Sequence, residues 1–484
     1  MKSTRLRNYV LTIVLLIVPA VAQHHDISSG EQHPTAEALG EISFPTSGPA
    51  DAQKHFIRGV LLLHSFEYAR ARAAFAEAIK IAPSFAMAYW GEAMTHNHSI
   101  WAEQDRDAAI AVLNKLAPTP AERAEKAPTQ REKLYFAAVE KLYGEGDKVQ
   151  RDAAYSAALA DLSARFPDDV EARAFYSLSM LGLTGTIRNT ENYMRGAAVA
   201  EEIFAVNRNH PGALHYLIHA YDDPVHAPLG LRAAKLYGTV AKGASHAQHM
   251  PSHIFFALGM WDDAISANIA SMKTARDGGQ GGYHPLHWLE HAYLQQGKMD
   301  DAAKLVSTIE ADLKTKPTTQ ARNHLAMARA TWLVETLGRD LPSMLEPIDE
   351  AGSGKYAGFE MAVGLEYVRR NDLDAARKAL DRVKAAGPAS LMERMLDAAI
   401  EFAAGSKDAA IRKAVEAAEA EDKMIFEYGP PPMVKPAWEF AGEMYLKLGR
   451  SNEAVDAFQR ALKVYPNRRL SNEGIKAAKA VTAK

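Results

Sequence analysis

The chain has 484 residues, of which 48% are hydrophobic and 24% charged, so it has ample apolar material for a folded core and is not a disordered chain. Its formal net charge is only −3 at pH 7, which argues against nucleic acid or an anionic membrane surface as a partner. It contains no cysteine, so disulfides and thiol catalysis are excluded, and any metal site must use His, Asp, Glu or Met.

The first 22 residues have the pattern of a secretory signal peptide. Three basic residues precede an apolar run over residues 9–18, and Ala20-Val21-Ala22 provides a small-residue cleavage site. The apolar run is too short to span a bilayer as a helix. We therefore expect the signal (residues 1–22) to be removed, the mature protein to be periplasmic or secreted, and no membrane anchor to remain.

Residues 23–50 are polar and rich in Ser, Gly, Pro and His, which predicts a flexible N-terminal segment. Cleavage after Ala22 would leave Gln23-His24-His25 as the new amino terminus. A free amine with His in third place can chelate copper or nickel through the amine, two amides and the imidazole. The alternative is a terminus that holds no ion.

Helix pairs are predicted from residue 51 to residue 484, because no segment shows the period-two alternation of a sheet. The segment 435–468 shows most clearly how such pairs are built. Small residues let its two helices approach, and aromatic residues fill the space between successive pairs. The anchors of both kinds, with the closing proline, are Trp438, Gly442, Tyr445, Ala454, Phe458, Ala461 and Pro466. Their spacing resembles the tetratricopeptide repeat (TPR) pattern.

The resemblance to the TPR family covers about residues 51–484. It implies an all-α solenoid of helix pairs wound as a right-handed superhelix. Gly59, Phe75 and Pro83 repeat the same arrangement near the other end of the chain. We expect about ten to eleven helix pairs, followed by a capping helix. The repeat is specific for the fold and weak for function, since TPR arrays mostly bind peptides and proteins.

Three histidine pairs at helical i, i+4 spacing stand out among the 18 histidines. One helical turn separates the members of a pair, so both imidazoles project from the same helix face. The first two pairs begin 34 residues apart, which is the TPR period. All three lie in the His-rich region 210–295. The pairs are His215/His219, His249/His253 and His287/His291.

Three short strings carry a narrower resemblance. They run from His96 to Trp101, from His215 to Pro224 and from His249 to Ile254. These strings look like those of a group of exported bacterial TPR proteins without assigned activity. The resemblance supports the fold and export, and it leaves the chemistry open.

The six paired histidines predict a metal-binding surface. In TPR arrays the helix positions that they occupy line the concave groove, and neighbouring helices pack about 8–10 Å apart. Imidazoles from successive helices can then nearly meet over the groove. All-nitrogen ligation suits zinc or copper, with zinc–nitrogen distances of about 2.0–2.1 Å. The leading hypothesis is a periplasmic scaffold that binds a transition metal on this surface.

Two other functions stay open. In the first, the same groove binds a peptide or protein partner without a metal, and the histidines donate hydrogen bonds and stack. In the second, the protein is a metal-dependent hydrolase or oxidase. Residues 287–291 spell H-x-x-E-H, in which Glu290 would be the general base, and Asp222 is a second candidate for proton transfer. Further groove candidates are His64, His96, His98 and Trp101.

Overall fold

The computed structural model describes residues 36–183, 188–277, 282–339, 342–345, 348, 356–386, 390–424 and 429–482. The predicted signal peptide, the His24-His25 terminus and the remainder of residues 23–35 lie outside these ranges. So do residues 278–281, which form most of the glycine-rich stretch before His284.

The first half of the described chain is built from short helices joined by tight turns. In chain order these are η1 (Ala36–Leu39), α1 (Ala50–His64), α2 (Tyr68–Ile81), α3 (Ala86–Met94), η2 (Ser99–Trp101), α4 (Arg106–Leu116), α5 (Pro120–Lys126), α6 (Gln130–Leu142), α7 (Lys148–Arg165), α8 (Val170–Gly182), α9 (Thr190–Val206), α10 (Pro211–Ala220), α11 (Ala227–Val240), α12 (Ser245–His249) and α13 (Pro251–Ala257).

The second half continues in the same way. Its helices are α14 (Trp261–Asp277), α15 (Tyr283–Gln295), α16 (Met299–Thr315), α17 (Thr319–Glu335), η3 (Pro342–Leu345), α18 (Ala357–Arg369), α19 (Leu373–Ala385), α20 (Ser390–Ala403), α21 (Lys407–Glu421), α22 (Ala437–Lys447), α23 (Ser451–Val464) and α24 (Arg469–Thr482). Within the described ranges, the only strands are the two-residue β1 (Asn97–His98) and β2 (Glu103–Gln104), which pair antiparallel. The predicted all-α fold is therefore confirmed.

Successive helices pack as antiparallel pairs around small residues, as the sequence pattern predicted. A Cβ atom on Gly59 in α1 would lie 2.6 Å from Cε1 of Phe75 in α2. The same relation recurs in the last repeat, where a Cβ on Gly442 in α22 would lie 2.9 Å from Cε1 of Phe458 in α23. Phe75 and Phe458 are almost completely buried. Each fills the wedge that its glycine leaves open.

Gly59→Ala is expected to destabilise the protein by about 1–3 kcal/mol, because the added methyl group overlaps the Phe75 ring in a close-packed interface. Gly238→Ala in α11 is the matched control, since the nearest atom to its new Cβ would be 3.6 Å away. That change is expected to be neutral or to stabilise the helix by up to about 1 kcal/mol. Urea unfolding measures the free energy of unfolding of both variants. Equal denaturation midpoints would contradict the close packing of Phe75 against Gly59.

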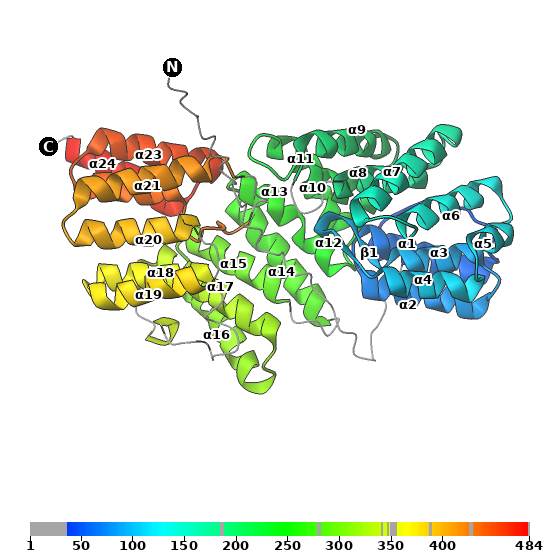
Figure 1. The fold of residues 1–484 in the computed structure, drawn as a ribbon, viewed down its shortest axis with the longest axis horizontal. Coiled ribbons are helices and arrows are strands. Elements are labelled where there is room, and N and C mark those ends of the chain that lie inside the picture. Colours follow the sequence, from blue (N-terminus) through cyan, green and yellow to red (C-terminus); the bar gives the residue numbers. More distant parts are fainter. Residues whose placement is uncertain are drawn as a thin grey trace, which may run out of the picture.

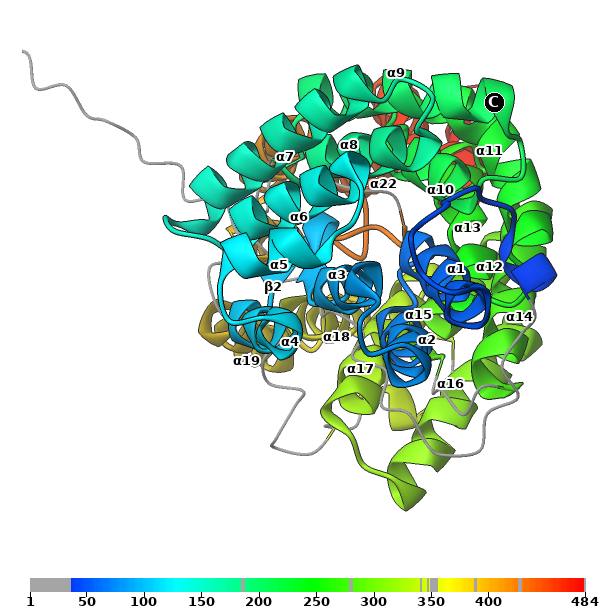
Figure 2. The same cartoon turned by 90° about the vertical axis from the view of Figure 1, so that its right-hand side faces the viewer.

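The array follows one long axis. Helices α1–α6 lie at one end, α18–α24 at the other, and α10–α15 in between (Figure 1). Viewed along this axis, the helices are arranged around it (Figure 2), and both views place α1 beside α10 and α12. None of the described helices combines the length and apolar character needed to cross a membrane.

The first turn of the array closes on itself. The turn between α1 and α2 packs against the loop that connects α11 to α12, where the Arg70 guanidinium donates to the Gly243 carbonyl oxygen at 2.8 Å. The Tyr237 hydroxyl donates to Ser65 Oγ at 3.2 Å, and the Gly243 amide donates to the Ala38 carbonyl at 2.7 Å. This closure places the end of α1 directly over the inner face of α10 and α12.

The second half closes in a similar way through the loop between α23 and α24. Trp261 Nε1 donates to the Asn467 carbonyl oxygen at 3.2 Å, and Asn467 Nδ2 donates to the Gly259 carbonyl at 3.2 Å. The Arg469 amide donates to Gln295 Oε1 at 2.9 Å. The C-terminal ends of α13, α15 and α17 therefore contact the loop between α23 and α24 and the start of α24.

Candidate metal centre

Three imidazoles converge on one point inside the first closed turn. His215 and His219 lie one turn apart on α10, and His246 lies near the start of α12. The Nε2 atom of His215 is 3.1 Å from Nε2 of His219 and 3.1 Å from Nε2 of His246. All three ligand atoms lie within 4.8 Å of one another. These residues are the first triad.

Hydrogen bonding fixes the direction of the His215 ring. Its Nδ1 donates to the backbone carbonyl oxygen of His64, at the end of α1, at 2.7 Å. In the neutral imidazole the lone pair is then on Nε2, which faces His219 and His246. A single in-plane lone pair cannot accept two good hydrogen bonds at once. Three such nitrogens are therefore poorly served by hydrogen bonds to one another, whereas one cation can engage all of them.

A second group of three imidazoles lies beside the first. His249 ends α12, His253 lies one turn further on in α13, and His284 lies at the start of α15. Nε2 of His249 is 3.0 Å from Nε2 of His284, and the three ligand atoms again lie within 4.8 Å of one another. These residues are the second triad.

Two members of the second triad are oriented by acceptors behind them. His249 Nδ1 donates to Asn268 Oδ1 at 2.7 Å, and the Asn268 amide is itself held by a 2.8 Å bond to the Ala264 carbonyl. His253 Nδ1 donates to the Asp222 carboxylate at 2.6 Å. An acceptor on Nδ1 fixes the tautomer and makes Nε2 a better donor to a metal. Asp222, predicted from the sequence as a candidate for proton transfer, therefore orients His253 in the structure.

Aromatic rings form the walls of both triads. The Phe66 ring centroid lies 4.2 Å from that of His215, and 5.7–5.8 Å from those of the other two members of the first triad. Phe66 has a φ of +56°, a conformation that costs free energy for a residue with a side chain. The Trp288 centroid lies 4.5 Å from that of His253 and 4.9 Å from that of His249. Packing of the closed turn thus holds both rings against the imidazoles.

Burial lowers the pKa of four of these imidazoles. Desolvation lowers the pKa of His215 to about 3, although the hydrogen bond to the His64 carbonyl acts in the opposite direction. Desolvation also lowers the pKa of His219, His249 and His284 well below the ordinary value, and neighbouring histidines add to the effect. A neutral imidazole is the form that binds a metal. Burial therefore favours the metal-binding form of these four residues.

The fully buried residues His64, Glu171 and His210 also lie close enough to hold an ion, but their hydrogen bonds are already complete. His210 Nδ1 accepts from the Ala213 amide, so its Nε2 donates to Glu171 Oε1 at 3.1 Å. His64 Nε2 bonds Glu171 Oε2 at 2.7 Å, and the Tyr216 hydroxyl bonds His64 Nδ1 at 2.7 Å. We interpret this group as a structural network.

The charge of this network stays on Glu171. Burial alone would raise the pKa of its carboxyl group, but the charges and hydrogen bonds of His210 and His64 outweigh burial and lower the pKa to about 2. The network also connects to the first triad, because the carbonyl oxygen that orients His215 belongs to His64. His64, predicted from the sequence as a groove residue, thus supports the first triad from behind.

The third histidine pair joins neither triad. His287 Nε2 lies 3.0 Å from the Thr331 hydroxyl of α17. His291 packs against Phe256 and Trp261, with ring centroids 5.6 and 6.0 Å away. The six predicted ligands therefore do not all take part in the groups that could hold a metal among the described residues. Four of them belong to the two triads. The other two triad members are His246 and His284, which have no histidine partner at i, i+4 spacing and were therefore not predicted.

Glu290, the predicted general base, is fully buried on α15. Among the described residues neither of its carboxylate oxygens has a hydrogen-bond partner. Burial, and then repulsion from Glu335, raise the pKa of Glu290 well above its ordinary value. Burial therefore favours the protonated form of Glu290, which belongs to neither triad.

The remaining groove candidates lie near β1. Trp101 is close to the first triad, 6.1 Å from the His246 ring and 5.4 Å from Phe66. His98 stacks on Tyr68 with centroids 3.9 Å apart. His96 is half-buried, and desolvation lowers its pKa to about 4. Of these, Trp101 contacts a triad residue through its ring.

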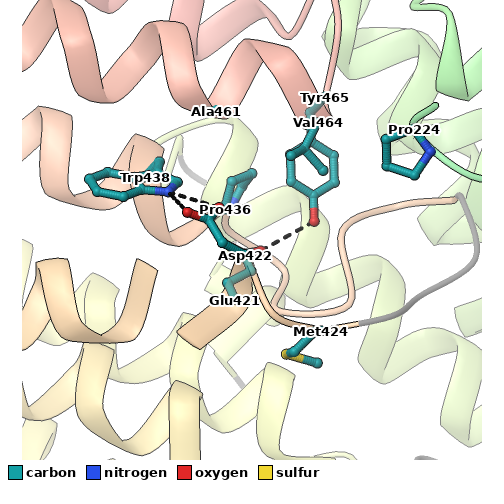
Figure 3. Close-up of a pocket in the computed structure, with 9 residues that line it drawn as sticks. All are labelled: Pro224, Glu421, Asp422, Met424, Pro436, Trp438, Ala461, Val464 and Tyr465. Carbon is teal, nitrogen blue, oxygen red and sulfur yellow. Dashed lines mark hydrogen bonds between the residues drawn. The ribbon is translucent and has the colours of Figure 1, made fainter. Parts of the chain in front are cut away.

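A small cavity of about 100 Å³ lies elsewhere, between α21, α22 and α23. In it the Tyr465 hydroxyl donates to Glu421 Oε1 at 3.2 Å and Trp438 Nε1 donates to Asp422 at 3.0 Å (Figure 3). Burial raises the pKa of Glu421 to about 7. None of the lining residues is a triad histidine. They are Pro224, Glu421, Asp422, Met424, Pro436, Trp438, Ala461, Val464 and Tyr465.

Comparison with known proteins agrees with the helical architecture. The family model described as tetratricopeptide repeat matches residues 436–468. No curated protein matches the chain. Similar solved structures include the TPR domain of P58(IPK) (14% identity, 90% of this chain and 99% of that chain, TM-score 0.24) and yeast Tom70 (10%, 89% and 89%, 0.32). The human IFIT1 dimer with m7Gppp-AAAA is a third (11%, 91% and 91%, 0.39).

The family match coincides with α22 and α23, the pair in which Trp438, Gly442 and Phe458 have the packing expected of the repeat. The described chain therefore has an all-α fold of helix pairs, and its residues 436–468 match a tetratricopeptide repeat.

Proposed function

We propose that this protein is a TPR-type scaffold whose central repeats bind transition-metal ions in the two histidine triads. The observation that carries the proposal is the convergence of three Nε2 atoms in the first triad, at 3.1 Å from His215 to each of the other two. His215 Nε2 has one lone pair and two such neighbours, whereas a single cation can bind all three nitrogens.

The donor set indicates which ions fit. Each triad offers three imidazole nitrogens and no thiolate, which suits zinc or copper better than magnesium or calcium. Three protein ligands leave an open position, as catalytic zinc sites do. The acceptors behind His215, His249 and His253 are of the kind found behind metal-bound histidines.

The location is part of the proposal. A signal sequence at residues 1–22 and the absence of cysteine suit an exported protein in a compartment that supplies zinc and copper. In that setting the protein would sequester, present or deliver a metal. TPR folds commonly bind proteins or peptides, so a protein partner could receive the ion.

A metal-free adaptor that binds a peptide over the same histidines is less well supported. The end of α1 already occupies the inner face of α10 and α12, where Phe66 covers the first triad and the His64 carbonyl bonds His215. A peptide at that position would have to displace the N-terminal repeat. A peptide partner would therefore bind elsewhere on the array.

Metal content of the purified chain tests the proposal. Protein prepared without chelators, in a His25→Ala background that removes the amino-terminal copper chelate, is expected to bind about two ions per chain with affinity sufficient to raise its melting temperature. His246→Ala and His284→Ala are each expected to lose one ion.

The control is His55→Ala, which changes a histidine of α1 outside both triads and is expected to keep both ions. Circular dichroism checks that the variants retain their helices. Absence of stoichiometric zinc or copper, together with a melting temperature that responds to neither, would remove the proposal.

A further inference from the structure

The two triads are near neighbours held at a fixed separation by α12. This helix carries His246 of the first triad and His249 of the second, three residues apart and so adjacent on one helix face. A second contact also joins the two triads. The ring centroid of His219, in the first triad, lies 6.2 Å from that of His253, in the second. Ions bound in the two triads would therefore sit side by side, with their open positions close enough to share one small ligand.

The charge around the triads limits which ions fit best. Imidazole is a neutral ligand, so the six ligands bring no negative charge of their own. Asp222 accepts from His253 Nδ1 at 2.6 Å, and Glu67 accepts from the His246 backbone amide at 3.3 Å. A buried cation is close by, since the Arg188 guanidinium donates to the His219 carbonyl oxygen at 2.8 Å and pairs with Asp223 at 3.0 Å. The free energy cost of burying charge rises steeply with its magnitude. Two monovalent ions therefore suit this pocket better than two divalent ions.

The coordination number agrees with that preference. Copper(I) accepts three nitrogen donors, whereas zinc needs a fourth ligand to complete a tetrahedron. Imidazole is a good ligand for copper. Two copper(I) ions in the two triads would satisfy both the donor count and the charge.

We propose that the two triads form one dinuclear copper centre that binds dioxygen between its ions; this inference rests on the proposed metal-binding function. The atoms and electrons balance without a further reactant. Each copper(I) gives one electron to become copper(II), and O₂ accepts both electrons to become bridging peroxide. The O–O π bond is lost, copper–oxygen bonds form on both ions, and no proton is transferred.

The net charge of the centre does not change in this step. Two copper(I) ions carry two positive charges, and two copper(II) ions with one peroxide dianion carry the same total. A buried site of neutral ligands therefore tolerates the oxidation, because the dianion compensates the added charge where it arises.

Aromatic rings border both triads. Phe66 and Trp101 border the first triad, and Trp288 borders the second. His215, His219 and His249 are almost completely buried, whereas His246 and His284 are only partly covered. Dioxygen can therefore approach along the side of the last two residues.

Copper loading under argon followed by exposure to oxygen tests the inference. The His25→Ala chain, stripped of metal, is loaded with two equivalents of copper(I) and then exposed to O₂. We expect uptake of one O₂ per two copper ions, an intense near-ultraviolet charge-transfer band, and no electron paramagnetic resonance (EPR) signal, because the two bridged copper(II) ions couple. His55→Ala is expected to behave in the same way.

Single-triad variants distinguish a pair from two separate sites. His246→Ala and His284→Ala are expected to bind one copper, to show no charge-transfer band, and to give an ordinary copper(II) EPR signal after oxidation. His246→Gln and His284→Gln replace them should the alanine variants lose helical content.

The outcomes separate this inference from the function on which it rests. Two bound coppers that each give an isolated copper(II) signal in the parent chain would show independent triads, which overturns the dinuclear centre and leaves metal binding in place. Two bound zinc ions with no uptake of copper(I) would have the same consequence. No binding of either metal would overturn both.

Discussion

Replacing Glu171 by alanine is expected to destabilise the folded protein by about 3–5 kcal/mol, the usual cost of removing one member of a buried ionic network. Its two carboxylate oxygens bond His64 at 2.7 Å and His210 at 3.1 Å, and all three side chains are inaccessible to solvent. Without the carboxylate, both imidazoles keep N–H groups that neither water nor protein can satisfy.

The measurement is denaturant unfolding at pH 7 of the metal-free chain. Glu202→Ala is the matched control, because Glu202 belongs to α9 and its side chain is mostly exposed in its pair with Arg173. A surface pair of this kind contributes about 0–1 kcal/mol. Equal losses in the two variants would contradict the assignment of Glu171 to a buried network.

The same substitution has a second expected consequence. Because the His64 carbonyl orients His215, a displaced His64 should weaken metal binding at the first triad more than at the second. Titration of the Glu171→Ala chain with zinc is therefore expected to give one unchanged and one weakened site. Uniform weakening would indicate a general loss of packing.

The helical repeat was predictable because its determinants are local. Trp438, Gly442 and Phe458 lie within 21 positions of one another, and their spacing reflects the contact of two consecutive helices. The same holds for Gly59 and Phe75, whose close approach in the structure repeats that of Gly442 and Phe458. Contacts between adjacent helices therefore appear in the sequence as residues of similar type at a regular spacing.

Only some members of the two triads could be predicted from the sequence. The pairs His215/His219 and His249/His253 follow from helix geometry, but His246 and His284 join them from neighbouring helices at separations that vary with loop length. His246 is 31 residues after His215, and His284 is 35 after His249. A search for single histidines near the 34-residue period, in addition to i, i+4 pairs, would have found both.

The contacts that close the array could not be predicted, because they do not recur at a regular spacing in the sequence. The contact of α1 with α10 joins residues more than 150 positions apart, as in the bond between the His64 carbonyl and His215. This closure buries the first triad, turns the expected open groove into an interior, and makes His64 a supporting residue. It depends on the accumulated rotation of several helix pairs, which no short segment of the sequence determines.

Acidification of the metal-free protein from pH 7 to pH 5 is expected to destabilise it. Burial lowers the folded-state pKa of His215 and of His287 to about 3, whereas both groups titrate near 6.5 when unfolded. Between these values the unfolded chain binds more protons than the folded one, so stability is fully present above pH 6.5 and falls as the pH drops toward 3. From pH 6.5 to pH 5, each group contributes a loss of about 2 kcal/mol.

Other buried groups determine the net slope of this pH dependence. The pKa values of His219, His249, His284 and His291 are also lowered by burial, so they add to the loss. The carboxyl groups of Glu290 and Glu421 act in the opposite direction, since their pKa values are raised and acid relieves the cost of burying them. The histidines outnumber the two acids, and a net loss of stability is therefore expected.

The His287→Gln variant isolates one contribution to the acid sensitivity. Glutamine can still bond the Thr331 hydroxyl that lies 3.0 Å from His287 Nε2, but it does not titrate. Its unfolding free energy is expected to fall by about 2 kcal/mol less than that of the parent between pH 6.5 and pH 5. Urea unfolding at a series of pH values measures both curves. Parallel curves would mean that His287 is protonated as readily in the folded chain as in water, and that burial does not hold it neutral.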